Sequence, residues 1–186
     1  NERTGTPFNF LEYPTDVVLL VVLWRLRYKL SLRDLAEMFL ERGWVFTYES
    51  VREWERRFAP LLVEQLRRKR RGQAGQSWYV DETYVKVKGR WCYLYRAIDA
   101  DGNLVDSRLS EKRDMEAAHR GVKQRYYPMH GFGNFESAAR FCCTFDELRT
   151  YFRSRHSMGE TISLTEQRRL FCERLAALQL LMRMAS

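Results

Sequence analysis

Two adjacent carboxylates, Asp81 and Glu82, interrupt a run of strand-forming residues in the segment WYVDETYVKV, residues 78–87. Because side chains alternate between the two faces of a strand, Asp81 shares a face with Thr83 and Val85, and Glu82 points to the other face. A carboxylate inside a strand loses hydration, which is costly unless a cation pairs with it. Asp81 is therefore the first candidate for a functional residue, and it calls for a cationic partner.

The elements around Asp81 are predicted to form one antiparallel sheet. Residue alternation and the turn signals Lys88-Gly89 and Asp99-Ala-Asp-Gly-Asn103 separate three strand-forming segments. The expected strands are residues 78–87, about 91–98, and 104–109. The pattern thus predicts a three-stranded meander with Asp81 on its first strand.

Three helices are expected before this sheet. The first opens at Pro14-Thr15-Asp16 and continues through about Tyr28. The second, within residues 32–43, has Ser31 as its N-cap and ends at Gly43. The third begins after Thr47, and Pro60 is predicted to mark its end.

The second and third helices form a helix-turn-helix candidate, in which the third helix would enter the major groove of DNA. Its exposed face carries the candidate DNA-binding residues Tyr48, Arg52 and Arg56, because Arg can bond guanine bidentately and Tyr can hold phosphate. Glu49 and Glu53 on the same face oppose DNA binding. A plain three-helix bundle with solvated charges is the alternative.

The net charge of +8 and the pI of about 9.5 favour a polyanionic partner. A basic run follows the third helix, and its five cations either contact phosphates or face water. We predict that this run is a linker tracking the DNA backbone, and we place the domain boundary between residues 1–72 and 73–186. The candidate phosphate contacts in the run are Arg67, Arg68, Lys69, Arg70 and Arg71.

The remaining composition argues for a cytoplasmic protein. The longest apolar run, residues 17–24, is too short to cross a bilayer. Four cysteines lack the spacing of a zinc site and are interpreted as free, buried thiols. Three further helices are expected downstream, capped by Ser110, Asn134 and Ser163, and the last is a packing or dimerising element.

Three long segments resemble the insertion-sequence transposases of the Asp-Asp-Glu (DDE) type. The segment WYVDETYVKVKGRWCYLYRAID, followed by DGNLVDSRLSEKRD, looks like the start of their catalytic core. Upstream, YPTDVVLLVVLWRLRYKLSLRDLAEMFLERG and TYESVREWERRFAP resemble their helix-turn-helix module. Downstream, HRGVKQRYYPMHGFGNFESAARFCCTFDELRTYF resembles their C-terminal end, so the resemblance covers nearly the whole chain.

The resemblance implies an α+β protein with an N-terminal helix-turn-helix domain, a truncated RNase H-like core and C-terminal helices. Asp81 then takes the place of the first catalytic carboxylate, and three such carboxylates would hold two Mg²⁺ ions. The family's second Asp, in a Thr-Asp-Gly segment, has no counterpart here, as if an internal stretch were deleted. Glu116 stands where the third carboxylate is expected, three residues before His119, although an exposed helical Glu without a catalytic role is the alternative.

The expected function is therefore that of a transposase-family protein that binds the double-stranded ends of a transposon and is catalytically impaired. Mg²⁺ binding at Asp81 and Glu116 would be weak or absent. A non-catalytic DNA-binding repressor of an intact transposase is the alternative. Because the missing segment would leave the first strand with a bare edge, we expect a homodimer that pairs through this edge. The expected location is the cytoplasm of a prokaryote, in association with the nucleoid.

Overall fold

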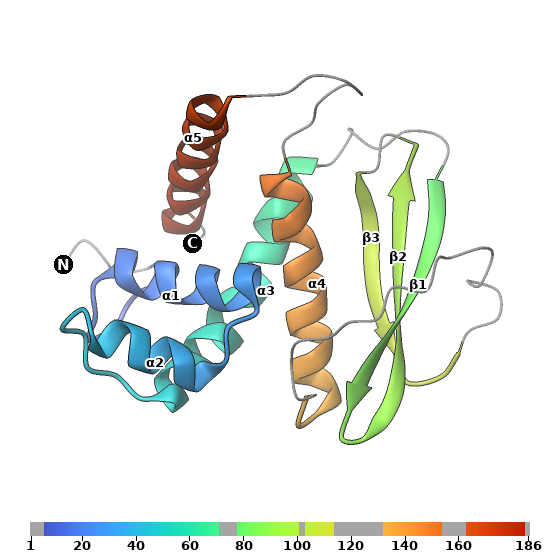
Figure 1. Cartoon of the computed structure of the whole chain (residues 1–186), viewed down its shortest axis with the longest axis horizontal. Coiled ribbons are helices and arrows are strands. Elements are labelled where there is room, and N and C mark those ends of the chain that lie inside the picture. The colour runs from blue at the N-terminus through green and yellow to red at the C-terminus, as the bar shows by residue number, and fades with distance from the viewer. Residues whose placement is uncertain (1–5, 71–77, 101–102, 114–131, 154–162, 185–186) are drawn as a thin grey trace.

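The computed structural model describes residues 6–70, 78–100, 103–113, 132–153 and 163–184, and these form an α+β fold, as predicted (Figure 1). A helical head of α1–α3 precedes a three-stranded antiparallel sheet, and two helices follow the sheet. The helices are α1 (Thr15–Tyr28), α2 (Leu32–Leu40), α3 (Tyr48–Arg70), α4 (Phe135–Phe152) and α5 (Leu164–Arg183). The strands are β1 (Trp78–Val87), β2 (Arg90–Asp99) and β3 (Leu104–Ser110).

Local signals in the sequence set the boundaries of the head. The Ser31 side chain accepts a hydrogen bond from the Asp34 backbone N–H, and the Asp34 carboxylate accepts one from the Ser31 N–H, which completes a capping box at the start of α2. Gly43 has a φ of +81°, a conformation that side chains rarely adopt, and α2 ends three residues before it. The Phe46 and Trp54 rings meet edge to face with centroids 5.0 Å apart, so the segment between α2 and α3 is tied to the core.

The predicted end of the third helix at Pro60 is wrong, because α3 continues to Arg70. A proline inside a helix removes one hydrogen bond and crowds the carbonyl four residues earlier. Here the apolar stripe of the helix continues beyond it with Leu62 and Leu66, both buried, while Pro60 itself is exposed. Burial of this stripe in the hydrophobic core favours a continuous helix, and helix α3 therefore extends from the head to the side of the sheet (Figure 1).

The sheet confirms the predicted meander, with strand order β1-β2-β3. Lys88 and Gly89 both have positive φ, 47° and 78°, as a tight hairpin turn requires. Strand β1 is an edge strand among the described residues, and Phe132 pairs with its last residue, Val87. The inner face of the sheet, with Val85, Leu94 and Leu109, joins the same hydrophobic core as α4.

Two predicted caps on the C-terminal side are confirmed and one is wrong. Asn134 accepts a hydrogen bond from the Ser137 N–H at 2.7 Å and begins α4, and Ser163 caps α5 in the same way. Ser110 instead ends β3, and its hydroxyl contacts the backbone of Lys112, so residues 111–113 are not helical. The rest of that predicted helix lies outside the described residues. Within the described part of the chain, no helix has the length and apolar character needed to cross a membrane.

Candidate functional site

Asp81 lies on β1 directly opposite Arg96 on β2, and the two side chains form an ion pair. The Arg96 side chain is buried, and it also donates a hydrogen bond to the Thr83 hydroxyl, with an Nη2–Oγ1 distance of 2.9 Å. The second Asp81 oxygen, Oδ1, is buried and has no hydrogen-bond partner in the described structure. Arg96 is therefore the cationic partner expected for a carboxylate on a strand.

A second carboxylate meets the same guanidinium from the helical side. Asp146, on the buried face of α4, lies 3.6 Å from Arg96 Nη1 and accepts a 2.9 Å hydrogen bond from the Ser107 hydroxyl. Burial raises the pKa of Asp146, and Arg96 and the Ser107 hydrogen bond only partly oppose this rise. Arg96 thus sits between two carboxylates, one from the sheet and one from the helix.

Sequence reasoning missed both Arg96 and Asp146. Arg96 could have been found from strand pairing, since the short hairpin places it opposite Asp81. Asp146 offered only a weak signal, an acid on the same side of a predicted helix as the apolar Cys142.

The described residues do not fit a divalent metal site at Asp81. A two-metal site needs several carboxylates around a shared position, and no group of three metal-ligating side chains occurs among the residues that the structure describes. The Arg96 guanidinium lies beside Asp81 and balances the charge of its carboxylate, so this charge needs no metal ion. Glu116, the other predicted ligand, lies outside the described residues.

Residues 67–70 of the predicted basic linker form the last turn of α3, and two of their arginines stabilise the packing of α3 on α4. Glu147, whose side chain is only 2% exposed, accepts hydrogen bonds from Arg67 at 3.1 Å and from Arg70 at 2.8 Å. Burial raises the pKa of Glu147, and the two guanidinium groups only partly oppose this rise. These two arginines therefore tie α3 to α4. Arg71 lies outside the described residues.

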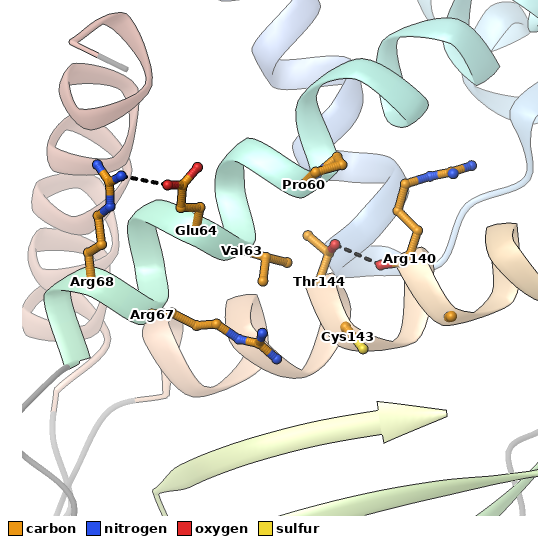
Figure 2. Close-up of a pocket in the computed structure, with 9 residues that line it drawn as sticks. Pro60, Val63, Glu64, Arg67, Arg68, Arg140, Cys143 and Thr144 are labelled. Atoms are coloured by element: carbon orange, nitrogen blue, oxygen red, sulfur yellow. Dashed lines mark hydrogen bonds and ion pairs between the residues drawn. The ribbon is translucent and has the colours of Figure 1, made fainter. Parts of the chain in front are cut away.

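Arg68, from the same run, lines a groove between α3 and α4 (Figure 2), whereas the Lys69 ammonium lies 5.1 Å from the centre of the Tyr151 ring. The groove has a volume of about 720 Å³, and Arg67, Arg68 and Arg140 contribute to its lining. Arg68 pairs with Glu64 at 2.5 Å on the α3 side, as Figure 2 shows. The groove is thus cationic on both of its helical walls.

The predicted DNA-reading residues lie together on the first turns of α3. Arg52 and Arg56 are exposed, and each forms a surface pair with the glutamate three residues before it, Glu49 or Glu53. Tyr48 lies between two cations, because the guanidinium carbons of Arg33 and Arg52 are 5.4 Å and 5.5 Å from its ring centroid. Arg33 comes from α2 and was not among the predicted residues.

The four cysteines are free, as predicted, but they are not all buried. Cys92 and Cys142 are buried, Cys143 is partly buried and Cys172 is exposed on α5. Burial raises the pKa of Cys142 and Cys143, so neither is a reactive thiolate at neutral pH.

Comparison with known proteins relates the segment that contains Asp81 to DNA transposition. Residues 75–124 match the family model of a DDE domain. The transposase of the insertion sequence-like element IS431mec from Staphylococcus aureus strain Mu50 is 40% identical over 117 residues, which are 63% of this chain and 52% of that protein.

The chain is similar to DDE-domain insertion-sequence transposases.

Two further relatives extend this similarity. The transposase of IS257 in transposon Tn4003 from Staphylococcus aureus is 39% identical over 117 residues, 63% of this chain and 52% of the relative. An uncharacterized Yersinia pseudotuberculosis protein, pYV0051, is 43% identical over 51 residues, 27% of this chain and 48% of the relative. The chain therefore spans about half the length of the transposases it matches. No solved structure matches it.

Proposed function

We propose that this protein binds double-stranded DNA through α3 and is impaired in the phosphodiester transfer of insertion-sequence transposases. One observation carries the proposal: the carboxylate of Asp81, in the segment that matches the DDE domain, is held in an ion pair by the buried Arg96. The guanidinium neutralises the charge that a divalent cation would need. DNA binding does not require this carboxylate, so the two activities are separable.

The case for DNA binding is the cationic surface at the start of α3. The Arg52 side chain is 57% exposed and that of Arg56 is 66% exposed, and each forms a surface pair with one exposed glutamate. Such pairs contribute little to stability, so a phosphate can replace the glutamate at small cost. Tyr48, close to Arg33 and Arg52, would add a phosphate contact. The glutamates limit affinity, and the net charge of +8 compensates for them.

Fluorescence anisotropy with a labelled duplex, at several salt concentrations, tests this interface. We expect Arg52→Ala to weaken binding and to lower the slope of log affinity against log salt by about 1, the loss of one phosphate contact. Arg169→Ala is the matched control, because Arg169 is also exposed and also paired with glutamates, but on α5. Equal affinities for wild type, Arg52→Ala and Arg169→Ala would refute DNA binding by α3.

A strand-transfer assay tests the impairment. We expect wild type and Asp81→Asn to give equal, background-level joining of a labelled donor end to plasmid DNA, with either Mg²⁺ or Mn²⁺. Metal-dependent joining by wild type that disappears in Asp81→Asn would show that the chain is an active transposase. Glu116→Gln in the same assay tests the remaining predicted ligand.

A repressor of an intact transposase is the second candidate function, and the Asp81–Arg96 pair favours it because a carboxylate held by a guanidinium is a poor metal ligand. Such a repressor would also pair with copies of itself, and the edge of β1 is the surface we propose for this homodimer. Only the last residue of β1, Val87, has a bridge on that edge in the described structure. Light scattering at micromolar concentration tests the homodimer. A molar mass equal to that of one chain would refute it.

The division into residues 1–72 and 73–186 remains a prediction. Helix α3 packs on α4, and Arg67 and Arg70 reach Glu147 on α4, so the head and the core share an interface. If the boundary is right, limited proteolysis will cut between residues 70 and 78 and leave two folded fragments.

A further inference from the structure

The face of the sheet that points away from α4 carries a cluster of three aromatic rings at the hairpin end, one exposed and two half-buried. Strand alternation places Tyr84, Trp91 and Tyr93 on this face. The centroid of Tyr84 is 6.5 Å from that of Trp91 and 5.5 Å from that of Tyr93. Trp91 is 59% exposed, although a Trp normally buries most of its large apolar surface.

Part of this face beyond the hairpin end is buried. Toward the other end of the strands, Glu82 and Tyr95 are buried. Glu82 pairs with Arg113 at 3.3 Å, and it accepts a hydrogen bond from the Tyr84 hydroxyl, which raises the pKa of that phenol. Tyr84 is therefore a neutral ring whose orientation is fixed by a buried acid.

Cations outnumber carboxylates around the rings. The Lys86 ammonium lies 5.8 Å from the centre of the Trp91 ring. Between residues 82 and 95, and in the three residues after β3, the sequence places five cations against two carboxylates, Glu82 and Glu111. All five are exposed: Lys86, Lys88, Arg90, Lys112 and Arg113.

An exposed tryptophan with two half-buried tyrosine neighbours, among cations, matches the chemistry of a single nucleic-acid strand. Bases stack on aromatic side chains, and neighbouring Lys and Arg attract the backbone phosphates. An apolar protein partner would bury these cations without counter-charges, which is unfavourable. A duplex keeps its bases stacked inside and offers no free faces to the rings.

We propose that the outer face of the β1–β2 hairpin binds single-stranded nucleic acid, with bases stacked on Trp91 and its two tyrosine neighbours. This site is distinct from the proposed duplex-binding surface on α3, and it does not depend on that proposal. At a transposon end it would hold a stretch of strand separated from its complement.

Anisotropy with a labelled oligothymidylate, in the full-length chain, tests the site. We expect Trp91→Ala to weaken binding about tenfold, the fold-change of one lost base stack, and Trp91→Phe to retain most of it. Phe10→Ala is the matched control, because Phe10 is an exposed ring (91%) on the head. Circular dichroism confirms that each variant is folded, and a parallel oligouridylate series shows whether the site prefers DNA or RNA.

An abasic oligonucleotide of the same length separates stacking from charge attraction. We expect it to bind about tenfold more weakly than oligothymidylate and to be insensitive to Trp91→Ala. Equal affinity for the abasic strand, or no effect of Trp91→Ala on oligothymidylate, would overturn the site. A change of oligomeric state in Trp91→Ala without a change in binding would mean that another copy covers this face, and would also overturn it. Arg52→Ala is expected to leave single-strand binding unchanged. A failure of the duplex-binding proposal can therefore be distinguished from a failure of this one.

Discussion

The charge row Asp81–Arg96–Asp146 predicts a large loss of stability in Arg96→Met. Methionine keeps much of the volume of the side chain but leaves two carboxylates without their cation. The Arg96 side chain is 9% exposed, and those of Asp81 and Asp146 are 20% and 3% exposed. Breaking a buried pair costs about 3–5 kcal/mol, and partial solvation of Asp81 places the expected loss at the low end, about 3 kcal/mol.

The loss should depend on pH, and its sign follows from Asp146. Burial holds the pKa of Asp146 above its ordinary value of 3.8, so the native state binds this proton more tightly than the unfolded chain does. The contribution of Asp146 to stability is thus fully present below that ordinary value and is lost as the pH rises through the native pKa. Removing Arg96 raises the native pKa of Asp146 further, so the destabilisation should be larger at about pH 7.5 than at about pH 5.

Urea unfolding followed by circular dichroism measures both effects. Adding Asp146→Asn to Arg96→Met should restore part of the stability at the higher pH, because one unpaired charge is gone. Arg169→Met, which removes an exposed arginine from surface pairs, should leave the free energy of unfolding nearly unchanged. A loss below about 0.5 kcal/mol in Arg96→Met, or an equal loss at the two pH values, would refute the buried charge row.

Two further substitutions test how the chain is held together. Ser31→Ala should lower the free energy of unfolding by about 1 kcal/mol through loss of the α2 cap, which urea unfolding will show; no change would mean that the capping box is dispensable. Phe58→Ala should cost about 3–5 kcal/mol, because Phe58 is fully buried and stacked on Phe8 with centroids 4.8 Å apart, and a change below about 1 kcal/mol in the same assay would place this ring outside the core.

Most of the local structure could be predicted from the sequence. Ser31, Asn134 and Ser163 each cap the helix they were expected to cap, and the three strands appear in the predicted order. These features depend on residues close together in the chain. Pro60 shows the limit of such signals: its local effect would end a helix, but the burial of Leu62 and Leu66 in the hydrophobic core outweighs it.

The sequence by itself determined the fold class, the position of Asp81 on a strand, and the similarity to transposases. Only the tertiary structure decided which charges meet. Arg96 pairs with Asp81 through strand register, whereas Asp146 and Glu147 reach Arg96, Arg67 and Arg70 through the packing of α4. Ion pairs depend on distance and burial, and contacts between residues far apart in the chain are set by the packing of whole elements.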